Sequence, residues 1–308
     1  MRFSLSSVYE NYLRRNFTSS GLLPQTIEID TQTTISFWSP NPKGHYSIEK
    51  PNLVLLHGFG PRSVWQWGPQ VKTLAPHFNL YVPDLIFFGN STTKSSDRST
   101  VFQAVSLGKL LEKLQVKCYS VMGTSYGGFV AYHMARLFED RVEKVIIASS
   151  ALNKNASDHQ EFLERAKVEK AEDVMLPKNA KQLKNLMKLA MVNCPPYLPD
   201  FLLNDFIQNM YNENLEEKKE LMKEFDFGNE ACLHVSPLQQ EVLIVWGECD
   251  QIFPFKKAQE LMKLLGDKAK LEVIKNTSHM PHCEDIKKFN NSVMKFLSGS
   301  SQTVSILI

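Results

Sequence analysis

The sequence lacks the marks of several large protein classes. Its 308 residues carry a formal net charge of +2, with no long basic run and no basic patch interleaved with aromatic residues, so nucleic acid is not expected as a partner. No window approaches the roughly eighteen continuous apolar residues of a membrane span, so no transmembrane segment is expected. There is also no internal repeat and no low-complexity tract. These absences leave a soluble globular protein that binds a small molecule.

Cysteine is scarce as well, and its spacing is irregular. The chain has an odd number of cysteines and no CxxC pair: Cys118, Cys194, Cys232, Cys249 and Cys283. This pattern argues against a disulfide framework and a zinc site, and it fits a reducing compartment such as the cytoplasm. Apolar residues recur at helical spacing between residues 5 and 17, which predicts a short helix docked on the domain. The Ser and Arg content of that segment keeps an organelle transit peptide or an interfacial anchor as alternatives.

What the chain does contain is an alternation of strand and helix patterns. Residues 26–30 and 33–38 are β-branched runs that predict an opening antiparallel pair. Six further runs are mostly apolar without alternation, which is typical of parallel strands covered on both faces: residues 52–58, 78–84, 118–125, 144–150, 242–250 and 270–279. Helical patterns fill gaps at residues 99–116, 126–138, 255–266 and 284–297. The prediction is a mostly parallel eight-stranded α/β sheet flanked by helices, with ligands at the carboxyl ends of its strands.

One interval breaks this alternation. From residue 151 to residue 236 the chain consists of helical patterns and loops, interrupted by Pro177 and by the CPPYLP segment. A loop of that length is implausible inside a compact domain, so we expect an inserted helical subdomain, which we interpret as a lid. The core then comprises residues 1–150 and 237–308.

Ser125 is the first candidate for chemistry. Gly123, Ser125 and Gly127 form a GxSxG motif between a predicted strand and a predicted helix, which is the context of a nucleophile on a sharp, strained turn. By itself the motif also fits a plain glycine-rich turn. Asp250 and His279 favour the nucleophile, because each lies just past a predicted strand and the order Ser, Asp, His is the one this topology produces. We therefore predict that these three residues form a catalytic triad.

Further residues complete the predicted site. His282 competes with His279, but it lies nearer the following helix, where a structural hydrogen-bonding role is favoured. Acyl chemistry also needs two backbone N–H donors where the oxyanion develops. Tyr126, directly after the nucleophile, and Phe59, in the HGFG loop after a central strand, are the candidates. His57 is expected to brace this loop rather than react.

These segments resemble the α/β-hydrolase superfamily over nearly the whole chain. The HGFG, GTSYGG, GECD and SHMPH segments occur in that family's order. The VPDLIFFGNS and CPPYLPDFLLNDFI segments are similar to a plant group of lidded serine hydrolases, usually named monoacylglycerol-lipase-like or C-C hydrolase-like. The resemblance implies the α/β-hydrolase fold with a helical cap and the triad named above. Tyr126 in place of Met and Ser278 in place of Gly depart from the usual pattern, and we expect them to narrow or reshape the pocket. Serine at position 125 argues against epoxide hydrolase and dehalogenase chemistry, which needs a carboxylate nucleophile.

The expected activity is that of a Ser-His-Asp hydrolase. It would cleave a small to medium apolar carboxylic ester, its small-molecule partner, through an acyl-enzyme and without a metal or organic cofactor. The candidate pocket residues lie beside the nucleophile and in the lid: Phe59, Tyr126, Met175, Met191, Phe206 and Met210. Met and Phe at helical spacing also pack a lid onto its core, so that interpretation stays open. C-C bond cleavage or acyl transfer by the same triad, and a small-molecule receptor of this fold, are the alternative functions.

Overall fold

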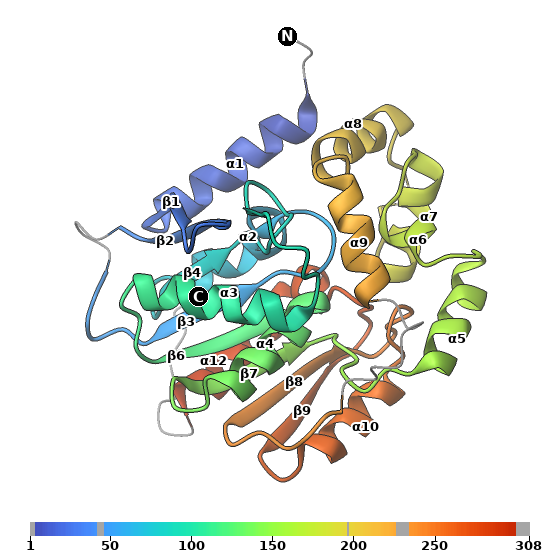
Figure 1. Ribbon diagram of the computed structural model, residues 1–308. Coiled ribbons are helices and arrows are strands. Elements are labelled where there is room, and N and C mark those ends of the chain that lie inside the picture. The colour runs from blue at the N-terminus through green and yellow to red at the C-terminus, as the bar shows by residue number, and fades with distance from the viewer. Residues whose placement is uncertain (1–3, 42–45, 196, 226–233, 300–308) are drawn as a thin grey trace.

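A mixed β-sheet organises the molecule. The computed structural model describes residues 4–41, 46–195, 197–225 and 234–299 (Figure 1). Eight strands follow one path in the order β1-β2-β4-β3-β6-β7-β8-β9, and β5 pairs with β2 beside that path. The strands are β1 (Leu22–Glu28), β2 (Thr33–Pro40), β3 (Asn52–Leu56), β4 (Asn79–Pro83), β5 (Thr92–Thr93), β6 (Tyr119–Thr124), β7 (Val142–Ala148), β8 (Glu241–Gly247) and β9 (Ala269–Ile274). The pairs β1–β2 and β2–β4 are antiparallel, and neighbours from β4 to β9 are parallel.

The expected α/β sheet is confirmed, with a difference in strand number. The sequence predicts eight strands, whereas the described residues form nine. The additional strand, β5, has only two residues, and they pair with Thr33 and Thr34 of β2. Two residues are too few to produce a periodic pattern, which is why the sequence does not reveal this strand.

Helices cover both faces of the sheet. They are α1 (Leu5–Ser19), α2 (Ser63–Leu74), α3 (Thr100–Lys113), α4 (Tyr126–Leu137), α5 (Ala156–Ala166), α6 (Glu172–Met175), α7 (Ala180–Ala190), α8 (Asp200–Met210), α9 (Leu215–Phe225), α10 (Lys256–Leu265), α11 (Pro281–Glu284) and α12 (Ile286–Ser298). Residues of α3, α4 and α10 share one apolar cluster with the sheet, and residues of α1, α2 and α12 share the cluster on the other face. The sequence patterns do not predict α2, because Gly68 and Pro69 lie in its middle.

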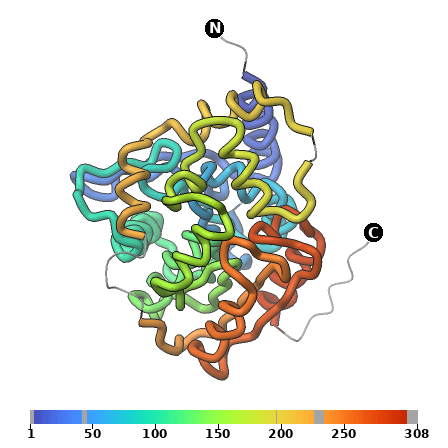
Figure 2. Tube along the Cα trace, turned by 90° about the vertical axis from the view of Figure 1, so that its right-hand side faces the viewer, coloured from blue at the N-terminus to red at the C-terminus, as the bar shows by residue number. Residues whose placement is uncertain are grey.

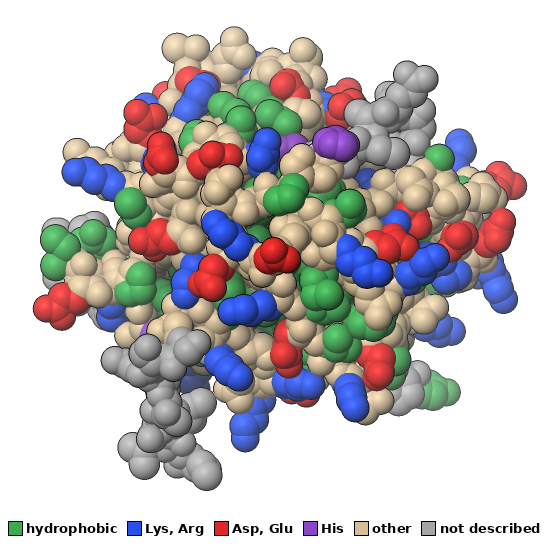
Figure 3. All heavy atoms as spheres, turned by 90° about the horizontal axis from the view of Figure 1, so that it is seen from below, with side chains coloured by type: hydrophobic (Ala, Val, Ile, Leu, Met, Phe, Trp, Pro, Cys, Tyr) green, Lys and Arg blue, Asp and Glu red, His purple; other side chains and the backbone are tan. Residues whose placement is uncertain are grey.

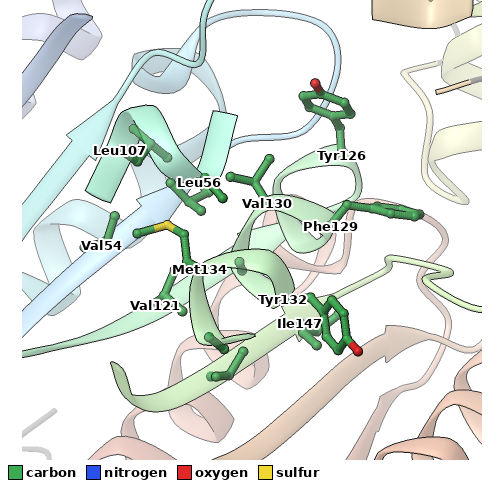
Figure 4. Packing of buried hydrophobic residues seen from close by; sticks show 14 of the residues in the cluster. Val54, Leu56, Leu107, Val121, Tyr126, Phe129, Val130, Tyr132, Met134 and Ile147 are labelled. Carbon is green, nitrogen blue, oxygen red and sulfur yellow. The ribbon is translucent and has the colours of Figure 1, made fainter. Parts of the chain in front are cut away.

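Coverage of both faces explains the continuous apolar strands. In β3, Val54 and Leu56 belong to the cluster on the α3 and α4 side, whereas Leu53 and Leu55 belong to the opposite cluster. Figure 4 shows Val54 and Leu56 packed with buried residues of β6 and α4. All four β3 side chains are at most 1% exposed. Each such burial stabilises the fold by about 1.5–3 kcal/mol relative to an exposed side chain, so both faces of the strand must be apolar.

Helices α5 to α9 lie between β7 and β8 in the chain. We call residues 151–225 the helical insertion. It has an apolar cluster of its own, which includes Val174, Leu183, Leu203 and Ile207. Figure 1 shows the helical insertion at one side of the sheet, and Figure 2, viewed from that side, shows it across the front of the molecule. The interval in which the sequence alternation stops is therefore the interval in which the chain leaves the sheet.

Helix α1 is docked on the rest of the molecule, as its apolar spacing predicts. Leu13 and Phe17 are buried in the cluster that α2 and α12 share. Its first turn contacts α8, because the Ser6 N–H donates to Asp205 Oδ2 over 2.8 Å. In the described ranges, no helix combines the length and the apolar character needed to cross a bilayer. On the face seen from below, acidic and basic side chains are intermixed (Figure 3).

Candidate active site

Ser125 lies on the turn between β6 and α4. Its backbone has φ 50° and ψ −119°, a left-handed conformation that costs a residue other than glycine about 1–3 kcal/mol. A Cβ on Gly123 would overlap the backbone of Gly127, and a Cβ on Gly127 would overlap the carbonyl oxygens of Leu56 and His57. Both positions of the motif therefore require glycine for steric reasons. The strained backbone of the serine between them favours the nucleophile interpretation over a plain turn.

Two hydrogen bonds hold this turn in place. The Ser125 N–H donates to the carbonyl oxygen of Ala148 at the end of β7, over 2.9 Å. The Ser125 carbonyl oxygen accepts a hydrogen bond from Ser150 Oγ over 2.7 Å. Because both partners belong to the neighbouring strand and its following loop, the turn is anchored to the sheet. The strain at Ser125 is thus maintained by bonds that the rest of the fold supplies.

Asp250 and His279 form a buried pair. They follow β8 and β9, which are parallel neighbours, so their carboxyl ends lie side by side. His279 Nδ1 donates to Asp250 Oδ2 over 2.9 Å, and the two residues are only 6% and 4% exposed. Asp250 Oδ1 accepts from the N–H groups of Ile252 and Phe253, at 2.8 and 2.9 Å. Because Nδ1 carries the proton that bonds to Asp250, the neutral ring has its free lone pair on Nε2.

Phe253 is the residue that connects the surroundings of Ser125 with those of His279. Among the described residues, no hydrogen bond joins the Ser125 hydroxyl to the His279 ring. The ring of Phe253 packs edge-on against His279, with 5.4 Å between the centroids. Phe253 and Ser125 also line the same cavity. The fold thus brings Asp250 and His279 into direct contact, and Phe253 links them to the cavity that Ser125 lines. Catalytic hydrogen bonds often tighten only when substrate is bound.

The two other histidines of interest are neutral and buried. His57 Nδ1 donates to the carbonyl oxygen of Gly58 over 2.8 Å, and His57 Nε2 accepts from the Leu85 N–H over 3.0 Å, so His57 braces the loop as expected. Burial lowers the pKa of His57 to about 4. The His282 ring lies against Trp67 and Phe289, with centroids 5.5 and 5.8 Å away.

His282 differs from its expected role. Neither of its ring nitrogens has a hydrogen-bond partner among the described residues, and burial lowers its pKa to about 3. Its backbone carbonyl oxygen, rather than its ring, accepts a hydrogen bond from Gln70 Nε2 over 2.6 Å. The expectation of a hydrogen-bonding side chain was wrong, because the ring packs against aromatic neighbours without bonding to them.

The loop after β3 presents backbone donors beside Ser125. A Cβ on Gly58 would lie 3.1 Å from the Cβ of Ser125, so loop and turn are in close contact. The Gly58 N–H is already used, since it donates to Gln66 Oε1 over 2.8 Å. Among the described residues, the N–H groups of Phe59 and Tyr126 donate to no protein acceptor. These are the two groups that the sequence indicates for an oxyanion.

Gln66 is a supporting residue that the sequence analysis missed. Besides accepting from Gly58, its Nε2 donates to the carbonyl oxygens of Gly58 and Pro61, at 3.0 and 2.6 Å. These three bonds fix the path of the loop on both sides of Phe59. The signal was hidden because Gln66 lies in α2, the helix that the patterns did not predict.

Ser125 opens into an apolar cavity. The cavity has about 650 Å³ of space between atoms, part of it open to solvent. Three of the six candidate pocket residues, Phe59, Tyr126 and Met175, line it. Further apolar side chains come from the helical insertion and the Asp250 loop: Phe162, Ala171, Met222, Phe225, Ile252 and Phe253. One wall carries Lys257, whose Nζ lies 2.8 Å from Asp158 Oδ2 and 3.0 Å from Glu260 Oε2.

The other three candidate pocket residues do not line this cavity. Met210 is 1% exposed and packs inside the apolar cluster of the helical insertion, and Met191 packs against the same cluster. The ring of Phe206 lies 5.0 Å from the ring of Trp65, centroid to centroid. Helical spacing identified these residues as apolar, but it does not tell which apolar face of a helix lies over the cavity.

Ser278 has a different role from the one expected. Its Oγ donates to the carbonyl oxygen of Leu189 over 2.8 Å, and the Met280 N–H donates to the Ala190 carbonyl oxygen over 3.2 Å. Glu284 adds a third connection, because its carboxylate accepts from the Val192 N–H over 2.7 Å and from the Ser278 N–H over 2.6 Å. The loop that carries His279 is therefore tied to the end of α7, and Ser278 does not line the cavity.

Comparisons with known proteins agree with this architecture. Residues 51–286 match the alpha/beta hydrolase fold family. A pimeloyl-acyl-carrier-protein methyl ester esterase of Vibrio vulnificus is 27% identical over 260 residues, covering 80% of this chain and 94% of that protein. A human monoacylglycerol lipase is 24% identical over 275 residues, covering 82% of this chain and 77% of that protein.

A solved structure shows the same fold. The 2-hydroxy-6-oxo-6-phenylhexa-2,4-dienoate hydrolase of Rhodococcus sp. strain RHA1 has a TM-score of 0.73 to this chain, with 19% identity over 90% of this chain and 99% of that one. The relatives named here are bacterial and human, and they do not support the plant affiliation that the resemblance implies. The match covers strands β3 to β9 and the helical insertion, and the chain belongs to the alpha/beta hydrolase fold family.

Proposed function

We propose that this protein is a serine hydrolase that cleaves carboxylic esters through an acyl-enzyme on Ser125. The observation that carries the proposal is the buried hydrogen bond between His279 Nδ1 and Asp250 Oδ2, in a fold that also holds Ser125 strained at the mouth of an apolar cavity. A serine hydroxyl is a weak nucleophile unless a base takes its proton. His279 is that base, because its bond to Asp250 leaves Nε2 as the acceptor.

The reaction proceeds in two symmetrical halves. Ser125 Oγ attacks the ester carbon while its proton passes to His279 Nε2, and the resulting imidazolium is stabilised by Asp250. His279 then gives the proton to the departing alcohol oxygen, which leaves the acyl group on Ser125. Water repeats the sequence, with His279 again taking and returning the proton. No atom of the chain is consumed.

The negative charge that develops on the carbonyl oxygen needs donors. We assign this role to the N–H groups of Phe59 and Tyr126, which have no other acceptor among the described residues. Loss of one such donor in comparable enzymes costs about 100- to 1,000-fold in rate. Gln66 and His57 support these donors indirectly, because they hold the loop that presents Phe59.

The cavity favours a neutral, apolar acyl group. Among the described residues its lining is dominated by aromatic, Met and Ile side chains, and the Lys257 ammonium in its wall is paired with Asp158 and Glu260. Two carboxylates for one ammonium disfavour an anionic group nearby. This balance favours a neutral ester over a dienoate such as the one named for the Rhodococcus hydrolase, and so favours ester cleavage over C-C cleavage.

The helical insertion would then act as the cap of the site. It supplies the cavity wall opposite Ser125 through residues of α5, α6 and α9. We propose that the cap extends over residues 151–236, with residues 1–150 and 237–308 as the hydrolase core; residues 226–233 lie outside the described part of the chain. The names of the Vibrio esterase and the human lipase also support an ester substrate.

Labelling with a fluorophosphonate tests the proposal without knowledge of the natural substrate. We expect the label on Ser125 by peptide mapping, and its loss in Ser125→Ala. Ser120→Ala is the matched control, because Ser120 lies on the same strand and should leave labelling intact. Hydrolysis of a panel of neutral esters should fall by several powers of ten in Ser125→Ala. Wild-type turnover by that variant, or cleavage of vinylogous ketones in preference to every ester, would overturn the proposal.

A further inference from the structure

A hollow on the helical insertion is rich in basic side chains. It has about 1690 Å³ of space between atoms, part of it open to solvent, and it lies among the end of α5, α6, α7 and the first residue of α8. The basic side chains that line it are Arg165, Lys167, Lys181, Lys184 and Lys188. The acidic ones in its described lining are Asp173 and Asp200, so positive charge prevails here although the whole chain has a formal net charge of only +2. We call this hollow the basic groove.

Three lysines of α7 form a stripe that the helix itself does not explain. Lys181, Lys184 and Lys188 are exposed at positions i, i+3 and i+7, which share one face of a helix, and we call them the α7 lysine stripe. Like charges at these spacings repel one another, and α7 contains no acidic residue that could offset them. Lys181 also lies in the first turn, where the helix dipole disfavours a positive charge. The stripe therefore weakens the helix that carries it.

Other surface helices pair their lysines with carboxylates. In α9, for example, Lys219 Nζ lies 2.6 Å from Glu216 Oε1. In the α7 lysine stripe, Lys184 Nζ lies 2.6 Å from Asp200 Oδ1, but both side chains are exposed, and such a pair exchanges partners at little cost. The other two lysines of the stripe have no ion pair among the described residues. Departures from local stability rules occur mainly at functional sites, so the stripe indicates an anionic partner.

The lining of the basic groove indicates what kind of anion fits it. Small-molecule sites enclose most of their ligand, whereas this groove is open, and four of its five basic side chains are exposed. Its described lining contains no aromatic side chain on which a nucleic-acid base could stack, and none of the exposed large apolar side chains that could enter a lipid surface. Apolar surface comes instead from Ala166 and Leu189, which are buried, and from Val168, which is partly buried. Basic and apolar groups together fit an acidic, amphipathic helix.

The basic groove adjoins the candidate active site. Arg165 Nε donates to the carbonyl oxygen of Gln251, in the loop after β8, over 3.1 Å. The carbonyl oxygen of Leu189 accepts from Ser278 Oγ, in the loop after β9, over 2.8 Å. These are the loops of the buried Asp-His pair. A partner in the basic groove would therefore dock beside the candidate site.

We propose that the basic groove binds an acidic, amphipathic helix of a partner protein. Carboxylates of that helix pair with the α7 lysine stripe, and its apolar side packs on Ala166, Val168 and Leu189. The proposal goes beyond ester hydrolysis and is independent of it, because it uses no residue of the proposed triad. The attraction is between exposed charges, so binding should weaken as salt is added.

Binding of a synthetic helix tests the proposal without knowledge of the natural partner. The probe is a fluorescent, hydrocarbon-stapled peptide of Ala, Leu and Glu, about four turns long, and its neutral counterpart has Gln in place of every Glu. In fluorescence anisotropy, we expect wild type to bind the acidic peptide more tightly than its counterpart, and to lose affinity as NaCl rises from about 0.05 to about 0.3 M. Lys181→Glu/Lys188→Glu should weaken binding by about tenfold or more. Because an acid in the first turn favours a helix, this variant should melt no lower than wild type, which separates lost binding from lost folding.

Lys263→Glu/Lys287→Glu is the matched control. It changes the net charge equally, at exposed positions of α10 and α12 outside the basic groove, and it should leave binding within about twofold of wild type. Equal weakening in both double variants, or no preference of wild type for the acidic peptide, would overturn the proposal. Tighter binding to vesicles of phosphatidylcholine and phosphatidylglycerol that depends on the same lysines would overturn the protein partner in favour of a lipid surface. Fluorophosphonate labelling of Ser125 should persist in the stripe variant, because the two proposals rest on different residues.

Discussion

Exchange of Asp250 for Asn probes the core of the proposed mechanism. The amide oxygen can replace Oδ1 and still accept from the N–H groups of Ile252 and Phe253. The amide nitrogen then takes the place of Oδ2, opposite His279 Nδ1, and it can only donate. His279 must respond by turning an unprotonated Nδ1 toward it, which moves the ring proton to Nε2. In that tautomer Nε2 has no lone pair with which to accept the Ser125 proton.

The expected loss follows from this change of tautomer. A wrong tautomer in a Ser-His-Asp triad costs about 10⁴-fold in kcat, which is about 5.5 kcal/mol of activation free energy at 1.36 kcal/mol for each factor of ten. The fold should change little, because the two backbone hydrogen bonds to position 250 persist and the residue stays the same size. We therefore expect a melting temperature close to that of wild type together with almost complete loss of activity.

The assay measures kcat and kcat/KM on the preferred ester and the rate at which a fluorophosphonate labels Ser125. Both rates should fall together, because both depend on removal of the Ser125 proton. Asp140→Asn is the control for loss of one acidic charge, since Asp140 is exposed after α4. An Asp250→Asn enzyme that keeps its fold and stays within tenfold of wild type would refute the assignment of Asp250 and of the His279 tautomer.

Two further predictions concern the contacts of the helical insertion. Ser278→Ala removes the hydrogen bond to the Leu189 carbonyl oxygen and leaves that buried acceptor unpaired. We therefore expect the free energy of unfolding to fall by about 1–2 kcal/mol and kcat to fall several-fold. If chemical denaturation and steady-state assays show no change in either value, this hydrogen bond does not hold the His279 loop. Lys218 is 1% exposed, and desolvation by burial lowers its pKa from 10.5 to about 8. Between these two pH values the unfolded chain binds more protons than the folded one, so the contribution of Lys218 to stability rises with pH. The difference in melting temperature between wild type and Lys218→Met should therefore shift in favour of wild type as the pH rises from 8 to 10. If the two plots of melting temperature against pH stay parallel, Lys218 does not titrate in this window.

Much of the candidate site could be predicted because its residues follow the ends of strands. Asp250 and His279 each follow a continuous apolar run, and in a parallel sheet the carboxyl ends of neighbouring strands meet at one edge. Ser125 could be recognised as a candidate because a side chain at either flanking glycine would overlap backbone atoms, so this turn requires glycine at both positions. These inferences needed only the order of elements and local backbone geometry, both of which leave a periodic or compositional trace.

The contacts that cross between elements left no such trace. Ser278 was singled out for its side chain, but its partner is a backbone carbonyl group at Leu189, 89 residues away, and every residue has such a group. Gln66 was missed because its helix contains Gly68 and Pro69. Met210 was placed in the pocket because it is apolar, whereas the packing of α8 turns it into the interior of the helical insertion. Each error comes from tertiary packing, which periodicity does not encode.

The helical insertion contacts several of the loops around the candidate site. A Cβ on Gly60 in the loop after β3 would lie 3.6 Å from the Tyr211 hydroxyl, and the end of α7 is bonded to the loop of His279. Glu213 adds a third connection. Its carboxylate pairs with Arg62 over 2.6 Å and accepts a hydrogen bond from the Gly89 N–H, in the loop after β4, over 3.1 Å. We therefore expect the sheet to place the candidate residues and the insertion to hold the loops that carry them. The same helices also form part of the cavity wall. Substitutions in the helical insertion should therefore alter substrate preference and turnover together.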